Sequence, residues 1–353
     1  VAFLLLCLAA IVIRPYSGDN AVLLNYAKCV ILFSTFILFS VFYYTFTRAE
    51  IKYEFLFSGM VLSFGLVYLF AITPLSGPDE MHHFQSVYTL SNLLMGKDPQ
   101  LGIAGDFDYH GFVLHQNVPS GYLRIVREFF SPAAGGETIV VPGSRTITYL
   151  PEYFLPALFV TLGRLLRLNT MHLCQLGRLA NVLLSAVCVY YAIKLTPKFK
   201  MLMGIVYTFP MALQQVASMS YDSFVNCMTL LTVALLFRAI FGEGKLTAGQ
   251  LIALAVVALL QAPAKTVYAF VIFLALFIPK ERFARQWIKY VYVPALILAC
   301  CGFSLFFFLS KPITSRAGDR TYYENGTMYG GAWVLSHIPQ SLVILLRSFL
   351  REG

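Results

Sequence analysis

The chain has 353 residues, of which 58% are hydrophobic and only 12% are charged, and its mean hydropathy is +0.72. Soluble domains carry about 25% charged residues, so this composition excludes an ordinary soluble protein and indicates a membrane protein with several spans. Lys and Arg (26) outnumber Asp and Glu (17), but the basic residues lie in short loops between apolar runs. Such loops set orientation in a bilayer, and nothing indicates a nucleic-acid partner.

The seven cysteines lie in or beside apolar runs, and none falls in the longest polar interval, 73–148. The sequence therefore predicts neither a disulfide framework nor a CxxC metal pair. The chain begins inside an apolar run and stops just after another. We therefore expect it to be a piece of a longer protein.

The apolar runs predict an all-α integral membrane protein, a polytopic bundle of about ten transmembrane helices in a single domain over 1–353. The predicted spans are 1–13, 26–46, 55–72, 179–195, 201–217, 223–241, 249–263, 266–279, 290–310 and 338–350.

Four short loops carry the clustered Lys and Arg residues: 48–52, 194–200, 238–245 and 280–289. The positive-inside rule predicts that all four are cytoplasmic. Residues 73–178 then form a large extracytoplasmic loop, and residues 311–337 form a second one.

The apolar segment 149–168 would turn every later basic cluster to the outside if it crossed the membrane. We therefore predict that both of its ends lie outside, as a re-entrant hairpin or as a helix at the interface. Its composition fits either form, because Pro151 and Pro156 interrupt it while Arg164 and Arg167 close it.

The stretch from Ser76 to Phe84 opens the outer interval directly after the 55–72 run. Pro78 suits the first turn of a helix, and Ser76 with Asp79 has the spacing of a capping box. In such a helix Asp79, His82 and His83 would share one face. The alternative is an ordinary capped helix, because acids favour a helix N-terminus.

Three further ionisable residues lie at predicted outer span ends. Asp222 is either a helix cap or part of a site. Lys265 is either a snorkelling lysine or a phosphate ligand. Arg178 begins a helix, where a positive charge is unfavourable, so we expect it to have an anionic partner, either a phosphate or an acidic side chain.

No cofactor follows from these patterns, although a divalent metal stays open. His82 and His83 could ligate one with Asp79 or Glu80, but their spacing matches no zinc signature. Asp106 and Asp108 form a further carboxylate pair, in a Gly-rich loop typical of solvated surface.

Five motifs resemble, in order and spacing, a bacterial family of polytopic membrane proteins that is grouped with the GT-C glycosyltransferases. They cover most of residues 70–280. The motifs are Pro78 to Phe84, Tyr149-x-Pro151 with Tyr153, Gly177-Arg178-Leu179-x-Asn181, Pro210-Met211 followed by Ser218-x-Ser220-Tyr221-Asp222, and Lys265-x-x-Tyr268.

The resemblance implies a GT-C fold in the bacterial cytoplasmic membrane. It also implies transfer of a sugar from a polyprenyl-phosphate-linked donor to a glycan or lipid acceptor, for cell-surface glycan or glycolipid assembly. Such a transfer needs a carboxylate base, for which we expect Asp79, with Glu80 as second choice or orienting partner. It also needs cations at the departing phosphate. The expected substrate-binding residues are His82, His83, Tyr149, Tyr153, Arg178, Tyr221, Asp222, Lys265 and Tyr268.

Two other functions stay open. A transporter or flippase of lipid-linked saccharide predicts inverted repeats and ionisable groups near the bilayer midplane, whereas these groups cluster at one predicted face and no repeat is apparent. A non-catalytic membrane scaffold with the same fold would tolerate substitution of Asp79.

Overall fold

The computed structural model describes residues 40, 41, 43, 44, 51–75, 77, 79–106, 130, 136–140, 149–310 and 336–343. The chain forms two compact units, Val1–Phe308 and Leu309–Gly353, and the bundle that carries the candidate site belongs to the first. The predicted spans 1–13, 26–46 and 338–350 and the outer loop 311–337 lie wholly or largely outside the described residues. Those assignments, and the single domain, stay predictions.

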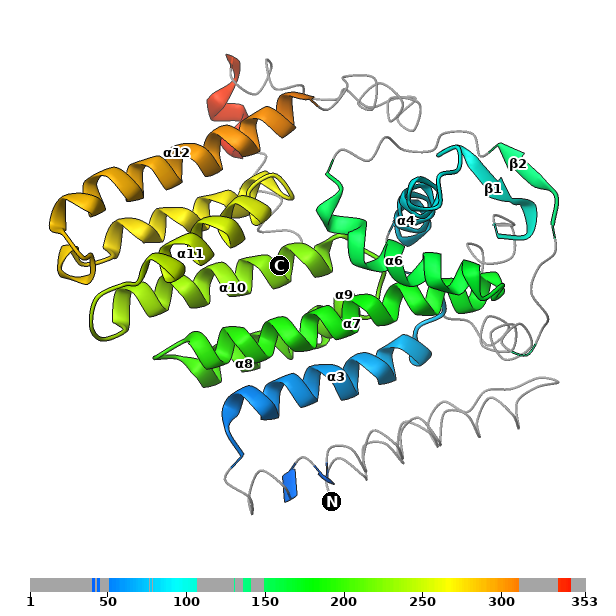
Figure 1. Cartoon of the computed structure of the whole chain (residues 1–353), viewed down its shortest axis with the longest axis horizontal. Coiled ribbons are helices and arrows are strands. Elements are labelled where there is room, and N and C mark those ends of the chain that lie inside the picture. The colour runs from blue at the N-terminus through cyan, green and yellow to red at the C-terminus, as the bar shows by residue number, and fades with distance from the viewer. Residues whose placement is uncertain are drawn as a thin grey trace. The chain divides into compact units, whose positions relative to one another are not determined.

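The described part of the chain is mostly helical (Figure 1). Its elements are α3 (Tyr53–Ala71), α4 (Glu80–Leu94), β1 (Leu101–Ile103), η1 (Ala104–Asp106), β2 (Thr138–Val140), α6 (Pro151–Leu165), α7 (Thr170–Leu195), α8 (Lys200–Tyr207), α9 (Pro210–Val216), α10 (Asp222–Phe241), α11 (Ala248–Gln261), η3 (Thr266–Phe277), η4 (Lys280–Arg282) and α12 (Gln286–Ser310).

Helix α7 lies between α3 and α10 and packs along both (Figure 1). Close approach to α3 depends on Gly65, because a Cβ built there would come 2.8 Å from the Val182 side chain. Side chains of α10, α11, η3 and α12 share a second apolar core that includes Leu236, Leu254 and Ile272. The apolar runs therefore form a helical bundle, and close side-chain packing at small residues such as Gly65 holds membrane helices together.

Four described helices are long and apolar enough to cross a membrane: Tyr53–Ala71, Thr170–Leu195, Asp222–Phe241 and Gln286–Phe307. Two more apolar helices, Ala248–Gln261 and Val267–Phe277, are shorter than a full span. The expected total of about ten spans is therefore not confirmed within the described residues.

The predicted single span 201–217 was wrong, because this segment forms two short helices. Helix α8 ends at Tyr207 and α9 begins at Pro210. Proline has no N–H for the helical ladder and drives the preceding residue out of the helical conformation. Phe209 accordingly has φ −61° and ψ 145°. The break allows α9 to be positioned independently of α8.

At one end of the bundle α7 continues past the end of α3, and α4 and α6 pack near this extension. The Arg178 guanidinium contacts the carbonyls of Ile72 and Thr73, just after α3. About two turns of α7 therefore lie beyond the end of α3. Gly163 of α6 lies against the side chains of Leu173 and Leu176 in those turns. Helix α6 thus packs on the extension of α7.

Helix α6 is one continuous helix of 15 residues, about 22 Å long, whereas a bilayer core is about 30 Å thick. Of the two forms that the sequence left open for 149–168, the structure contains a helix and not a hairpin. Its outward side chains Phe154, Leu158, Leu162 and Leu165 are all exposed and apolar. Such a stripe is typical of a helix lying in a membrane interface.

The basic clusters of three predicted cytoplasmic loops lie at the other end of the bundle. Arg282 is buried and donates hydrogen bonds to the carbonyls of Arg238 and Ala239 in the last turn of α10 and of Gly244 after it. The Lys245 ammonium reaches the Ala284 carbonyl at 3.3 Å. Lys198 lies 5.5 Å from the ring centre of Phe241. The 194–200, 238–245 and 280–289 clusters therefore share one end, as a common side of the membrane requires.

The all-α prediction missed a small antiparallel sheet between α4 and α6 in the chain. Strands β1 and β2 pair with Leu101 opposite Val140. The Asn92 amide of α4 donates to the Leu101 carbonyl at 2.5 Å, and its oxygen accepts from Arg164 of α6 at 2.8 Å. One amide side chain thus ties the sheet to both helices.

Candidate functional site

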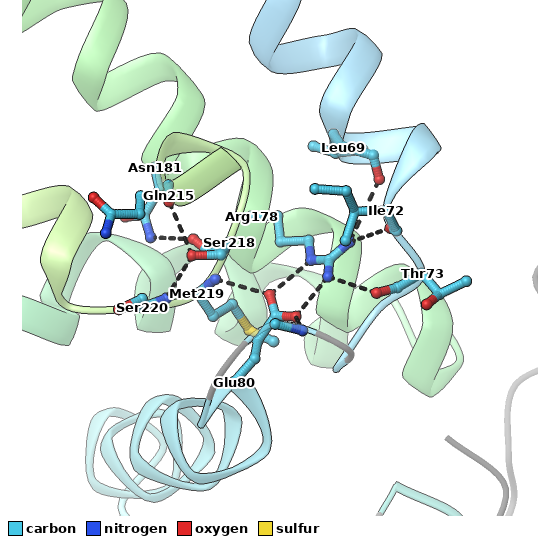
Figure 2. A network of polar contacts seen from close by, with 11 residues as sticks. Leu69, Ile72, Thr73, Glu80, Arg178, Asn181, Gln215, Ser218, Met219 and Ser220 are labelled. Carbon is cyan, nitrogen blue, oxygen red and sulfur yellow. Dashed lines mark hydrogen bonds and ion pairs between the residues drawn. The ribbon is translucent and has the colours of Figure 1, made fainter. Parts of the chain in front are cut away.

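A buried ion pair between Glu80 and Arg178 lies where α3 ends and α4 begins (Figure 2). The Arg178 Nε donates to Glu80 Oε1 at 2.8 Å and Nη2 donates to Oε2 at 2.5 Å. Both side chains are 0% exposed. This two-point geometry is the strong form of an Arg–carboxylate contact.

All five N–H donors of Arg178 have partners inside the protein. Besides the two bonds to Glu80, Nη1 donates to the Ile72 carbonyl at 2.8 Å and to Leu69 at 3.5 Å, and Nη2 donates to Thr73 at 2.9 Å. These carbonyls lie at the C-terminal end of α3, where a cation is favourable. Of the two partners left open for Arg178, the structure contains the acidic side chain, and no donor is left for a phosphate.

The loop before α10 closes the third side of this ion pair. The Met219 N–H donates to Glu80 Oε1 at 3.0 Å, and the Asn181 amide donates to the Ser218 carbonyl at 2.8 Å. Gly177 allows this approach, because a Cβ there would lie 2.9 Å from the Met219 sulfur. The motif from Gly177 to Asn181 therefore holds α3, α4 and the 218–222 loop together.

The environment of Glu80 keeps its carboxylate charged. Burial by itself would raise the pKa of Glu80, but the attraction of Arg178 and the hydrogen bonds from Arg178, Met219 and Gly77 outweigh burial and hold the pKa below its usual value. A carboxylate engaged in this way cannot take a proton from a substrate hydroxyl group without breaking the ion pair. Glu80 is therefore placed to orient its neighbours.

Asp79 is the exposed residue that directly precedes α4. Its backbone is left-handed, with φ 55°, and its side chain makes no capping hydrogen bond. The alternative of an ordinary cap at Asp79 is therefore wrong, and Asp79 does not share a helical face with His82 and His83, because α4 begins only at Glu80. Ser76 and Pro78 lie outside the described residues. Asp and Asn tolerate a left-handed backbone better than most residues, which fits the Asp at this position.

The two histidines of the motif, His82 and His83, have different hydrogen-bonding environments. His83 is buried, its Nδ1 lies 2.9 Å from the Tyr153 hydroxyl, and its ring meets the Tyr221 ring edge-on at 5.2 Å. His82 Nδ1 is buried and has no hydrogen-bond partner within the described part of the chain. His83 and Tyr153 thus connect α4, α6 and the loop before α10.

A second ion pair joins Lys265 to Asp222, with Nζ 3.0 Å from Oδ1. Its side chains are 39% and 26% exposed. The ammonium also lies 5.8 Å from the ring centres of both Tyr221 and Tyr268, within the range of a cation–π contact. Tyr221 is the N-cap of α10, so Asp222 is not the cap that the alternative interpretation required. Of the three ammonium donors, Asp222 takes one.

Lys265 remains a cation at neutral pH. Burial alone would lower its pKa, but the hydrogen bond and charge of Asp222 raise the pKa above its usual value. For Tyr221, burial raises the pKa first, Asp222 raises it further and Lys265 opposes them, while Glu152 and Asp79 add to the rise. Tyr221 therefore lies within electrostatic reach of Asp79 and Lys265, which are 186 positions apart in the chain.

Tyr149 has a packing position. It is 8% exposed, and its hydroxyl donates to the Leu260 carbonyl at 2.9 Å. Burial, followed by the charge of Glu152, raises its pKa to about 12. Its ring lies edge-on to Phe224 and Phe307, at 6.5 and 5.3 Å. Tyr149 therefore joins α10, α11 and α12, and its hydroxyl is engaged by the Leu260 carbonyl.

A cavity of about 230 Å³ lies next to the buried ion pair. Glu80 and Arg178 line it, together with Ile72 and Gly77 from the turn between α3 and α4. The opposite wall comes from α9 and the loop after it: Met211, Gln214, Gln215, Ala217, Ser218, Ser220 and Asp222. Asp222 thus belongs both to this cavity and to the pair with Lys265, while Asp79 and Lys265 are not among the lining residues.

Within the described residues, no group of three or more His, Cys, Asp or Glu side chains could hold a metal ion. Glu80 is occupied by Arg178 and His83 faces Tyr153. Of the carboxylate pair at 106 and 108, Asp106 ends η1 and Asp108 lies outside the described part.

Gln214 and Gln215 are the polar cavity residues that the sequence analysis missed. The signal was present, because two adjacent amides interrupt the apolar run 201–217 four residues after Pro210. Uncharged polar residues inside such a run need partners or a cavity. Because 201–217 was predicted as one span, these two residues were given no function.

The comparisons with known proteins agree with the membrane-protein assignment. A family model described as "Predicted membrane protein (DUF2142)" matches residues 62–352. No curated protein and no solved structure matches the chain. The matched segment contains all five sequence motifs and every residue of the candidate site. With a match over this length, the chain belongs to the predicted membrane protein family DUF2142.

Proposed function

We propose that the protein is a membrane glycosyltransferase that transfers a sugar from a polyprenyl-phosphate-linked donor to a glycan or lipid acceptor. The reaction would take place at the extracytoplasmic face of a bacterial cytoplasmic membrane. The observation that carries this proposal is the partly exposed Lys265 ammonium, held by Asp222 beside the Tyr221 ring, together with the exposed Asp79 carboxylate, whose charge also acts on Tyr221. Both groups lie at one end of an apolar helical bundle.

The chemistry assigns a separate task to each charge. Asp79 accepts the proton of the acceptor hydroxyl as the acceptor oxygen bonds to the anomeric carbon. The bond from that carbon to the phosphate oxygen breaks, and the phosphate leaves with the electron pair. Lys265 stabilises the departing phosphate with the two ammonium donors that Asp222 does not use. Glu80 and Arg178 hold the turn that presents Asp79.

The surroundings fit a substrate with a lipid tail. Leu202 lies on α8, Phe209 lies between α8 and α9, and Met211 lies on α9. Each of these side chains is more than half exposed. In a bilayer such side chains face hydrocarbon, and Met211 also reaches the cavity. A polyprenyl chain lying along these helices would bring its phosphate to the end of the bundle where Lys265 lies.

The test is transfer by the purified full chain in lipid nanodiscs, with radiolabelled polyprenyl-phosphate sugars and membrane-extracted acceptors. Asp79→Asn keeps the left-handed backbone, which Asn tolerates, and removes only the basicity. Transfer should fall by roughly 10²–10⁴-fold, while donor binding and detergent stability stay unchanged.

The matched control is Glu243→Gln, which removes an exposed carboxylate at the opposite end of the bundle and should leave transfer unchanged. Full activity of Asp79→Asn would remove Asp79 as the base. Absence of transfer by the wild-type chain from every polyprenyl-phosphate sugar would contradict the proposed reaction itself.

A further inference from the structure

The cavity beside the Glu80–Arg178 pair has no unbalanced positive charge. Glu80 and Arg178 neutralise each other and are fully buried. Asp222, the other ionisable residue of the wall, is paired with Lys265. A phosphate would therefore find no free cation inside the cavity, whereas Lys265 offers one outside its lining. The cavity and the cation are two separate places for two different groups.

The wall opposite the ion pair presents uncharged hydrogen-bonding groups. The Asn226 amide donates to Gln215 Oε1 at 2.7 Å, which fixes the amide of Gln215 so that its NH₂ group remains a donor. Ser220 Oγ accepts from the Asp222 N–H at 3.2 Å, which leaves its hydroxyl hydrogen for another acceptor. Gln214 adds a second amide, and this residue is exposed.

The remaining lining is apolar and the volume is small. Ile72, Met211 and Ala217 provide C–H surface beside the amides and hydroxyls. The volume of about 230 Å³ is below the range of about 300–1,000 Å³ for sites that take drug-sized ligands. A combination of hydroxyl-binding groups and a C–H surface suits one pyranose ring and leaves no room for an oligosaccharide.

We infer that this cavity binds a single uncharged sugar ring, with Gln214, Gln215 and Ser220 contacting its hydroxyl groups. The inference rests on the proposed function and deepens it, because it assigns the sugar to a cavity that the charged pair borders but does not fill. The ring belongs either to the donor or to the acceptor, and the shared chemistry is the polyhydroxylated ring. The broken helix explains the arrangement, since α9 begins anew at Pro210 and carries Met211, Gln214 and Gln215 to the wall.

Binding can be tested without turnover, on the full chain in nanodiscs, by saturation-transfer difference NMR. The probes are the methyl glycosides of glucose, galactose, mannose and N-acetylglucosamine, with inorganic phosphate as the charged comparison. At least one glycoside should bind the wild-type chain, and phosphate should not compete with it. Ser220→Ala, which removes one hydroxyl, should weaken binding about three- to tenfold.

Met211→Trp is the occluding variant, because Met211 is 73% exposed and borders the cavity, so a larger ring there narrows the entrance without changing the core. It should abolish glycoside binding. The matched control is Leu298→Trp, at a residue that is 72% exposed on α12 and does not line the cavity. This control should bind as the wild type does.

The outcomes separate the inference from the proposed function. Failure of all four glycosides to bind the wild type, or unchanged binding in both Met211→Trp and Ser220→Ala, would overturn the inference. Competition by phosphate for the same cavity would overturn it too. If glycosides bind as expected but no transfer occurs, only the proposed reaction fails. Where transfer is measured, a raised KM for the donor or for the acceptor in Ser220→Ala identifies which sugar occupies the cavity.

Discussion

Arg178 illustrates how a residue's partners decide its function. A charged arginine at the start of an apolar run needs an anion, and a phosphate would satisfy that need as well as a carboxylate does. In the structure the Glu80 carboxylate and three backbone carbonyls at the end of α3 accept hydrogen bonds from every N–H donor of Arg178. Of Arg178 and Lys265, Lys265 therefore remains available to a substrate, because it is partly exposed and shares only one donor with Asp222.

Substitution of Lys265 by Met keeps an unbranched stem and removes the charge. Loss of a charge-assisted hydrogen bond to phosphate costs about 1.5–3 kcal/mol, so donor affinity or turnover should fall by about one to two orders of magnitude. Equilibrium binding of radiolabelled donor in nanodiscs measures this. Lys245→Met, at the basic end of the bundle, is the control. Unchanged donor binding and turnover in Lys265→Met would return Lys265 to the snorkelling class.

Removal of one member of the buried pair should destabilise the protein strongly. Glu80→Gln leaves the Arg178 charge buried and unpaired, which costs about 3–5 kcal/mol. The double variant Glu80→Gln with Arg178→Met removes both charges and should lose less than the sum of the two single losses. Thermal unfolding in detergent, followed by size-exclusion chromatography, measures each change. Additive losses would contradict the coupling.

The same pair predicts a pH dependence. Because the folded pKa of Glu80 lies below its usual value of 4.5, its contribution to stability is fully present above about pH 4.5 and is lost as the pH falls through the folded pKa. The wild-type chain should therefore lose thermal stability below about pH 4.5 more steeply than Glu80→Gln does. Parallel pH profiles of the two proteins would argue against a charged Glu80 in the folded state.

At the scale of the elements, glycine positions set how closely helices approach. Gly204 of α8 faces the Phe57 ring of α3, and a Cβ built there would come 2.3 Å from a ring atom. Phe57 is 5% exposed and packed in the core, so its ring has little room to move. Gly302 of α12 has no heavy atom within 4 Å of such a Cβ. A side chain at position 204 would therefore collide with α3, whereas a side chain at position 302 would meet no neighbour.

Gly204→Ala should destabilise the protein by about 1–3 kcal/mol, because overpacking displaces a buried ring. Gly302→Ala is the matched control and should be neutral or stabilising, by up to about 1 kcal/mol, since Ala favours a helix over Gly. Thermal unfolding of both variants in the same detergent makes the comparison. Equal effects would contradict the close packing of α8 on α3.

At the scale of the whole bundle, charges separate into two ends. The basic loops join one another through Arg282, Lys245 and Lys198, and the two ion pairs of the site lie at the other end. Helix α6 packs against the turns of α7 that extend past α3. This arrangement fits the prediction that all basic loops lie on one side of the membrane, because segment 149–168 need not cross the bilayer.

Cysteine accessibility labelling tests this topology in intact cells. Asp106→Cys, in η1 between α4 and α6, should react with a membrane-impermeant maleimide from outside, and Lys198→Cys, between α7 and α8, should react only after permeabilisation. Residue 198 is exposed in the structure, so protection cannot come from burial. Labelling of both positions from the same side would refute the proposed orientation.

The sequence by itself determined what depends on local pattern. Hydropathy over about 20 residues identified a membrane protein and most of the described apolar helices. Loop charges predicted which ends share a side. An arginine at a helix start indicated that Arg178 has an anionic partner. These properties are readable because each depends on residues that are neighbours in the chain.

Only the tertiary structure decided the partners and the cavity. Arg178 meets Glu80 across 98 positions and Lys265 meets Asp222 across 43. An ion pair requires charged atoms within about 4 Å, and no spacing rule predicts which distant carboxylate arrives there. The break before Pro210 was visible as a residue, but its effect was not, because a proline either kinks or ends a helix according to the packing around it. That packing turned Gln214 and Gln215 from residues within a predicted span into the wall of a cavity.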